Sequence, residues 1–173
     1  MRPVSKQTAR AVLLLGMVMP ALSGCLADAA SGVTSAVIDK LFETGPATIE
    51  ANIVAAEDLN PDYDGQASPL VVRMYELKSP TAFNNASFFA LYDSDVAELG
   101  DDLKGKEEIE LRPGDKLELE RELQPETRFV GFIAGYRDIE NAAWRAVTEV
   151  PEGETTDLKI DFGRLAVKIV EVD

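Results

Sequence analysis

The sequence predicts a mainly β protein, built as a sandwich of β-strands. Three observations lead to this class. Apolar and polar residues alternate with a period of two through most of the chain after Ala47, as half-buried strands require. Turn signals containing Pro, Gly, Asn or Asp separate these runs every 8–12 residues or so. A length of 173 residues also fits a single domain whose core needs no disulfide.

Residues 1–24 have the pattern of an export signal. The segment contains three basic residues, all before residue 11, and no acidic one. The apolar run that follows, at 11–22, is shorter than the about 20 residues needed to cross a bilayer. The run leads into Leu22-Ser23-Gly24-Cys25, which resembles the complete lipobox of bacterial lipoproteins. The alternatives are a plain signal peptide and a buried first helix that happens to contain a cysteine.

The lipobox resemblance implies that residues 1–24 are removed and that Cys25 becomes the first residue. Cys25 then carries a diacylglycerol on its sulfur and an acyl chain on its amino group, and two or more acyl chains anchor a protein stably. Leu26 follows the cysteine, whereas Asp at that position favours inner-membrane retention in the sorting rule of lipoproteins. We therefore expect an anchor in the outer membrane of a Gram-negative bacterium.

Residues 25–45 are predicted to form a lipid-anchored tether that ends in a short helix. Apolar residues recur at helical spacing over about 33–43, and Gly45-Pro46 ends the pattern. The few charges of this stretch do not form the basic face that interfacial helices favour, so we expect it to pack on the domain rather than on the membrane. The β-sandwich domain then occupies residues 46–173.

The domain is expected to contain about eight strands. The run at 129–136 is almost continuously apolar and predicts a central, buried strand, in which Gly131 and Gly135 indicate a bulge or a close backbone approach. Pro113-Gly114 suits a type II turn. In order, the strands are predicted at 47–53, at 70–77, at a segment ending with 109–111, and at 117–121, 129–136, 144–148, 158–162 and 165–171.

A helical insert is predicted between the second and third strands. Asn85 is the predicted N-cap of one or two turns that contain the apolar residues of 88–91. Ser94 is the predicted N-cap of a second short helix at 95–99, with Gly100 just beyond its end. Short helices between strands leave the fold class unchanged.

Composition narrows the function. The chain has no histidine, which removes the usual general base, the usual zinc ligand and the histidine-activated nucleophiles, so we predict that it is not an enzyme. Its single cysteine forms no intrachain disulfide. The net charge of −14 repels the phosphates of nucleic acids, so no nucleic-acid partner is expected.

The densest polar cluster joins the first two predicted strands. It approaches the start of a calcium loop at Asn60-x-Asp62-x-Asp64-Gly65, but Asn stands first and Val71 stands where a bidentate Glu is needed, so no metal site is predicted. A solvated connection is the plain structural alternative, and an acidic partner-binding loop is the functional one. The candidate residues are Glu57, Asp58, Leu59, Asn60, Pro61, Asp62, Tyr63, Asp64, Gly65 and Gln66.

Several stretches, in this order and behind a lipobox, resemble the TssJ (SciN/VasD) family, the outer-membrane lipoproteins of the type VI secretion system. The resemblance covers nearly all of the chain after Cys25. The stretches are Ser68–Lys78, Phe83–Leu91, Leu99–Asp102, Leu111–Gly114 and Ala134–Asp138 with Ala143–Arg145.

This resemblance implies a transthyretin-like sandwich of two four-stranded sheets with added helices. It also implies a periplasm-facing domain that binds the periplasmic C-terminal part of the inner-membrane protein TssM, in a membrane complex that includes TssL. In the family, the loop between the first two strands contacts TssM, and here that loop spans residues 56–68. No cofactor is implied beyond the lipid on Cys25.

Two other functions are compatible with these patterns. One is a lipid-anchored β-sandwich that binds calcium, a peptide or a glycan. The other is an enzyme on a transthyretin-like fold, which is the weakest because such hydrolases depend on histidines that this sequence lacks.

Overall fold

The computed structural model describes residues 45–172. The predicted signal peptide at 1–24, the lipid site Cys25 and the predicted helix at 33–43 lie outside the described residues. The domain from Thr44 onwards forms a compact unit by itself. Within the described range, no helix combines the length and the hydropathy that a membrane crossing requires.

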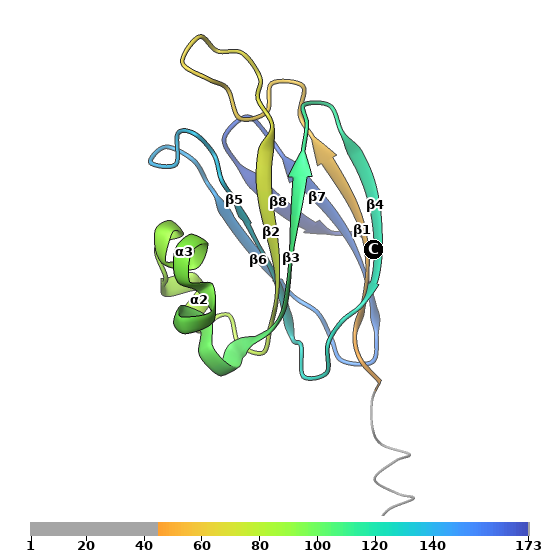
Figure 1. The fold of residues 1–173 in the computed structure, drawn as a ribbon. Helices are drawn as coiled ribbons and strands as arrows, with labels where there is room; N and C mark the ends of the chain where they lie inside the picture. The colour runs from red at the N-terminus through yellow and green to blue at the C-terminus, as the bar shows by residue number, and fades with distance from the viewer. Residues whose placement is uncertain (1–44, 173) are drawn as a thin grey trace, which may run out of the picture. The chain divides into compact units, whose positions relative to one another are not determined.

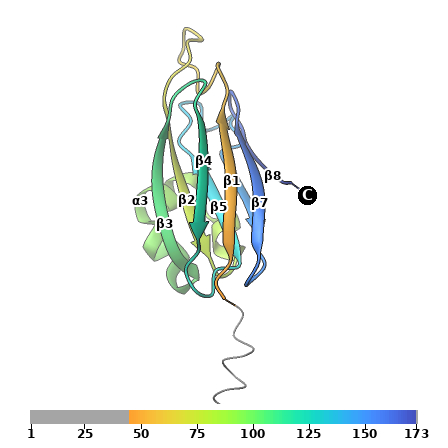
Figure 2. The ribbon, with the colours of Figure 1, turned by 90° about the vertical axis from the view of Figure 1, so that its right-hand side faces the viewer.

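Two four-stranded sheets face each other, as Figures 1 and 2 show. All neighbouring strands are antiparallel except β1 and β7, which run parallel. The prediction of a mainly β sandwich of two four-stranded sheets with short helical inserts is confirmed. The first sheet has the order β4 (Lys116–Glu122), β1 (Thr48–Ala55), β7 (Thr155–Phe162), β8 (Val167–Glu171), and the second has β3 (Leu103–Leu111), β2 (Leu70–Leu77), β5 (Phe129–Ala134), β6 (Arg145–Glu149).

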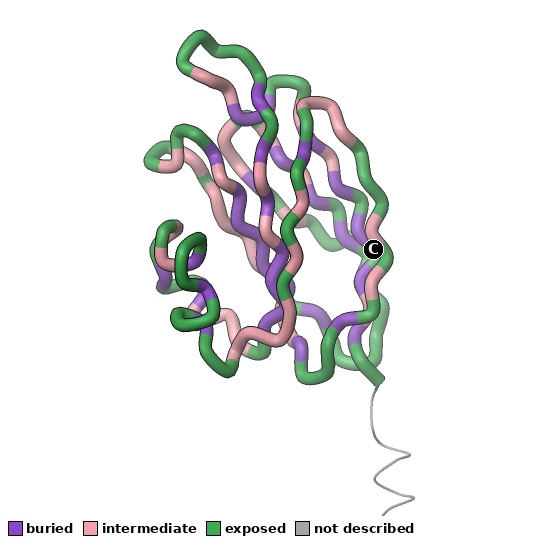
Figure 3. The backbone as a smooth tube through the Cα atoms, viewed as in Figure 1, coloured by how far each residue is buried: buried purple, intermediate pink, exposed green. Residues whose placement is uncertain are grey.

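The alternation of the sequence fixes which side of each strand faces inward. In β1, Ile49, Ala51 and Ile53 are buried, while Glu50 and Asn52 between them are exposed. The same alternation is visible along the first sheet in Figure 3. β2 and β5 are buried on both faces, because helices cover the outer face of the second sheet, so the predicted central strand at 129–136 is an inner strand.

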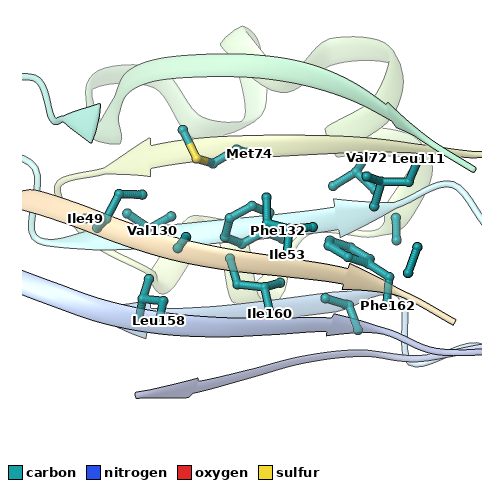
Figure 4. Packing of buried hydrophobic residues seen from close by; sticks show 14 of the residues in the cluster. Ile49, Ile53, Val72, Met74, Leu111, Val130, Phe132, Leu158, Ile160 and Phe162 are labelled. Atoms are coloured by element: carbon teal, nitrogen blue, oxygen red, sulfur yellow. The ribbon is translucent and has the colours of Figure 1, made fainter. Parts of the chain in front are cut away.

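The main core lies between the inner faces of the two sheets (Figure 4). Ile53 pairs in register with Ile160, and the rings of Phe132 and Phe162 meet edge-on with centroids 6.3 Å apart. Each fully buried side chain of this size contributes about 1.5–3 kcal/mol by leaving water. A core of this kind holds the sandwich together without a disulfide.

A second, smaller core lies between the outer face of the second sheet and the helical insert, which comprises α2 (Thr81–Asn85), α3 (Phe88–Leu99) and the 3-10 turn η1 (Gly100–Asp102). Phe83 fits against Gly131 so closely that a Cβ there would lie 2.8 Å from its ring. The sequence predicts a bulge or a close backbone approach at Gly131 and Gly135, but the group that approaches Gly131 is a side chain. At Gly135 a Cβ would lie 3.4 Å from the Val71 backbone oxygen. The buried members of this core are Tyr75, Leu77, Phe83, Ala86, Leu91, Leu99 and Ile133.

The prediction that Asn85 caps the main helix is wrong. Asn85 is the last residue of α2, and Ser87 is the N-cap of α3, with its side chain accepting a hydrogen bond from the Ala90 amide at 3.2 Å. Ala86 between them is extended, which separates the two helices. Ser94 has non-helical angles of φ −144° and ψ 34° and marks a kink inside α3, where the sequence predicts that a second helix begins.

The four connections β1–β2, β3–β4, β5–β6 and β7–β8 gather at one end of the sandwich, which we call the loop end (the top of Figure 1). The β3–β4 turn has Gly114 at φ 82° and a hydrogen bond of 3.0 Å from the Asp115 amide to the Arg112 carbonyl, as a type II turn requires. The described chain begins with Gly45 at the opposite end. The eight residues of β1 separate the two ends by roughly 25 Å.

Candidate functional site

The β1–β2 loop, residues 56–69, divides into a base and a tip. We call Leu59, Asn60 and Ser68 the base and residues 61–67 the tip. Leu59 is 0% exposed and belongs to the main core, and Asn60 is 3% exposed. The Ser68 amide donates to the Leu59 carbonyl at 2.9 Å and closes the base. The tip stands outside this closure, at the surface of the loop end (Figure 3).

Asn60 connects the base to two other loops. Its amide nitrogen Nδ2 donates to the Pro69 carbonyl at 2.7 Å, and its Oδ1 accepts from the Arg137 backbone amide at 2.8 Å. Its own backbone amide donates to the Arg164 carbonyl at 3.1 Å. The φ angle of 46° lies in the left-handed region, which Asn tolerates better than most residues. The β1–β2, β5–β6 and β7–β8 loops are therefore held in one fixed arrangement.

Tyr136 makes a second connection within this arrangement. Its side chain is buried, and its hydroxyl donates to the Gly163 carbonyl at 3.2 Å. Burial raises the pKa of this phenol well above its usual value. The neutral hydroxyl thus keeps the β5–β6 and β7–β8 loops together over the whole physiological range of pH.

The tip is closed by its own hydrogen bonds. The Asp62 amide donates to the Gln66 carbonyl at 2.8 Å, and the carboxylate of Asp62 accepts from the amides of Asp64 and Gln66 at 3.0 and 2.9 Å. Gly65 has φ 81°, which favours glycine at this turn. The tip therefore has a defined turn although it has no core of its own.

Tyr63 projects from this turn. With a relative exposure of 108%, it is the most exposed of the large apolar side chains among residues 45–172. A tyrosine held on a defined turn offers apolar area and a hydroxyl at a low cost in side-chain entropy, and such residues are enriched among the strongest contacts of protein interfaces. The tip thus has the chemistry of a protein-binding element.

A groove of about 330 Å³ lies between the tip and the neighbouring loops. Arg164 lies 3.7 Å from Asp58, and both side chains are more than half exposed, so this ion pair is weak. Arg137 forms no ion pair with any other described residue. The groove accordingly offers two guanidinium groups beside apolar surface. Its two carboxylates, Asp62 and Asp138, already accept hydrogen bonds within their own loops. It is lined by Pro61, Asp62, Tyr63, Arg137, Asp138, Arg164 and Leu165.

The ten predicted loop residues thus have different surroundings. Leu59 and Asn60 are buried in the base and have no surface to offer a partner. The carboxylate of Glu57 lies over the β3–β4 turn, about 3.0 Å from where a Cβ on Gly114 would stand, and the other seven lie at the surface. The groove residues of the β5–β6 and β7–β8 loops were not predicted from the sequence.

The calcium-like spacing at 60–65 serves the loop itself. The side chains of Asn60 and Asp62 are engaged in the hydrogen bonds that shape the base and the tip. Within residues 45–172, no three His, Cys, Asp or Glu side chains are grouped in a way that suits a metal ion.

Comparison with protein families matches residues 47–165 to the family described as type VI secretion lipoprotein, VasD, EvfM, TssJ. The comparison with curated proteins gives no match. Among solved structures, the type VI lipoprotein TssJ1 from Pseudomonas aeruginosa is 44% identical, with a TM-score of 0.72 over 74% of this chain and 98% of that chain.

Two further solved structures share the fold at lower identity. Lip of Serratia marcescens, described as a membrane bound component of the type VI secretion system, is 24% identical with a TM-score of 0.67, over 72% of this chain and 98% of that one. A chain in a structure titled as the TssM C-terminal domain from EAEC is 23% identical with a TM-score of 0.58, over 73% of this chain and 99% of that one.

Proposed function

This chain belongs to the family of type VI secretion lipoproteins, and on that premise we propose that it anchors a type VI membrane complex to the outer membrane. In this proposal Cys25 carries the diacylglycerol and the N-acyl chain, and the domain faces the periplasm. The domain binds the periplasmic C-terminal part of TssM, within a complex that also contains TssL. The protein acts by binding alone and needs neither a catalytic group nor a cofactor.

The structured tip of the β1–β2 loop is the observation that carries this proposal. Its turn is formed before any partner binds, because Asp62 and Gln66 close it, and Tyr63 is fully available. A preformed contact loses little conformational entropy on binding. The solved structure that names TssM contains a chain of this fold, which supports the choice of partner.

The position of the tip also suits a tether. Gly45, where the described chain begins, lies at the end of the sandwich opposite the loop end. Any lipid-bearing segment before Gly45 therefore joins the domain at one end, and the tip lies beyond the other. The attachment therefore does not cover the tip, which is left accessible to a partner.

The groove refines the chemistry of the contact. Arg137 and Arg164 lie beside Leu165 and Pro61. Guanidinium groups pair well with carboxylates in two-point geometry. We therefore expect the bound segment of TssM to place an acidic residue in the groove and an apolar residue against Tyr63.

Binding between residues 26–173 and the periplasmic C-terminal part of TssM from the same cell tests the loop. Replacing residues 62–66 by a Gly-Ser linker keeps Leu59 and Asn60, and should weaken binding at least tenfold in calorimetry. Tyr63→Ala should account for most of that loss. Val170→Ala, which trims another exposed apolar side chain, on β8, is the matched control and should bind normally. Undiminished affinity in the linker variant would exclude this loop as the contact.

The anchor is tested separately. Cys25→Ser should abolish incorporation of labelled fatty acid and release the protein from the outer-membrane fraction, because the acyl chains supply the attachment. Persistence of the variant in that fraction would overturn the lipid anchor and leave the TssM contact untouched.

A further inference from the structure

The helical insert exposes apolar side chains on a different surface from the tip. Phe89 and Val96 are each 62% exposed and Tyr92 is 36% exposed, and all three belong to α3. We call these three side chains the α3 face. The insert lies over the outer face of the second sheet, away from the loop end (Figure 1). Exposed aromatic and aliphatic side chains gathered on one short helix are typical of a surface that binds another molecule.

The aromatic side chains beside this face are held in place by stacking. The ring of Phe88 stacks on Tyr92 at 5.3 Å and meets Phe89 and Trp144 edge-on at 5.5 and 5.4 Å. The guanidinium group of Arg73 lies 4.4 Å from the centre of the Tyr92 ring. Phe89 and Tyr92 therefore rest on a fixed aromatic layer, and a partner gains their contact area at little cost in side-chain entropy.

The helical insert itself carries charge of one sign, and the cations that the neighbouring strands bring to it, Arg73 and Lys106, are each paired with a carboxylate. Residues 81–102 contain five acidic residues and no basic one. Asp95 turns inward, where Lys106 contacts its carboxylate at 2.8 Å and Arg73 lies 3.9 Å away. The other four form no ion pair with any described residue, so the insert that carries the α3 face keeps unpaired negative charge. They are Asp93, Glu98, Asp101 and Asp102.

The negative charge of the insert indicates which kind of partner can bind to the α3 face. A second copy of the chain would bring an equally acidic insert and would be repelled, and so would an anionic lipid surface. A segment whose apolar side chains are flanked by Lys or Arg satisfies both parts of the surface at once. From the geometry and charge together we infer that the α3 face docks a basic amphipathic segment of a protein partner.

The single tryptophan gives a direct readout. Trp144 touches Phe88, which contacts Phe89 and Tyr92 of the α3 face, so we expect a segment seated there to change the fluorescence of Trp144. The probes are synthetic amphipathic peptides of about 18 residues, or five helical turns, without aromatic residues. The first peptide contains Lys and Leu. The second replaces Leu by Ser and so lacks the apolar side chains, and the third replaces Lys by Glu and so reverses the charge. Titration into residues 26–173 should give saturable binding for the Lys/Leu peptide and at least tenfold weaker binding for the other two.

Paired variants locate the binding. Phe89→Ser with Val96→Ser should weaken binding of the Lys/Leu peptide at least tenfold. Val170→Ser with Val172→Ser removes the same kind of exposed apolar surface from the end of β8 and the residue after it, and should leave that binding unchanged. Asp93→Asn with Glu98→Gln should weaken it several-fold without touching the apolar residues. Equal binding of the Lys/Ser peptide, or an unaltered affinity in the Phe89/Val96 variant, overturns the inference, because attraction to the acidic domain as a whole would then explain the result. Thermal unfolding checks that each variant is folded.

Discussion

The β1–β2 loop and the α2–α3 insert are both attached to the outside of the same sandwich, but by different interactions. The loop has one apolar side chain in the core, Leu59, and is otherwise held by neutral hydrogen bonds centred on Asn60. The insert covers the second sheet with an apolar face and adds the ionised side chain of Asp95. The orientation of the tip therefore depends on a few directional bonds, whereas the insert depends on buried area and on charge.

The largest effect is expected at the apolar attachment of the insert. Phe83→Ala removes a fully buried ring that contacts Gly131 and should lower the free energy of unfolding by about 3–5 kcal/mol. Urea unfolding measures the loss. Asn84→Ala, one residue away and exposed, should stay within about 0.5 kcal/mol of the wild type. A loss below about 1 kcal/mol at Phe83 would show that the insert is only loosely packed.

The apolar attachment of the loop should give the next largest effect. Leu59→Ala is expected to cost about 2–5 kcal/mol, because it leaves a cavity in the main core. Hydrogen exchange should also speed up at the Ser68 amide, which bonds to the Leu59 carbonyl. Tyr63→Ala, four residues away in the tip, should change stability by less than about 0.5 kcal/mol. Similar losses at both positions would contradict the division into base and tip.

The polar attachment of the loop should contribute less. Asn60→Ala removes two side-chain hydrogen bonds and places an Ala at φ 46°, for an expected loss of about 1–3 kcal/mol. Asn60→Gly restores the freedom of the backbone without the hydrogen bonds and separates the two contributions. If the glycine variant were as stable as the wild type, the side-chain bonds would not hold the three loops together.

The smallest effect on stability is expected at Asp95, and its dependence on pH distinguishes the attachment of the insert from that of the loop. Burial opposes ionisation of Asp95, but Lys106 and the Val96 amide hold the pKa of this carboxyl below its ordinary value. Its contribution to stability is therefore present above the unfolded pKa of about 3.9 and is lost as pH falls through the lower folded pKa. Asp95→Asn should reduce stability at pH 7 and flatten its decline below about pH 4.

An exposed ion pair provides the control for this pH dependence. Lys78 and Lys104 lower the pKa of Glu126, but these groups lie at the surface. High salt should suppress the effect of Glu126→Gln on the acid unfolding curve and leave much of the Asp95→Asn effect, because the Asp95 carboxylate is buried and a partly buried pair is screened less, although Lys106 is half-exposed. Equal suppression of both effects would indicate that solvent reaches Asp95.

Much of the fold follows from local patterns. The prediction for β2 coincides with the observed Leu70–Leu77, because alternation and turn signals define a strand within a few residues of sequence. The parallel pairing of β1 with β7 could not be predicted, since it joins residues about a hundred positions apart and depends on the whole sandwich. Asn85 and Ser87 are residue types with similar N-cap preference, so the local sequence does not decide between them, and the structure shows Ser87 as the cap.

The candidate site is predictable in position but not in composition. The density of Asp, Asn, Pro and Gly marks the loop, yet the same pattern treats Leu59 and Tyr63 alike, and only the fold shows that one is buried and the other exposed. An apolar residue inside an acidic run is a weak signal of a buried anchor. Arg137 and Arg164 approach the loop from distant strands, so no local pattern could assign them to the groove.

The parallel pairing of β1 with β7 also constrains the order of folding. β1 is an inner strand of the first sheet, and its register with Thr155–Phe162 cannot form until nearly the whole domain is available. Contacts so distant in sequence form slowly, because a long loop must close before they stabilise the chain. A polypeptide that leaves the cytoplasm with its N-terminus first thus remains unable to complete the first sheet while it is being threaded. The topology thus delays closure of the first sheet until residues 155–162 are available.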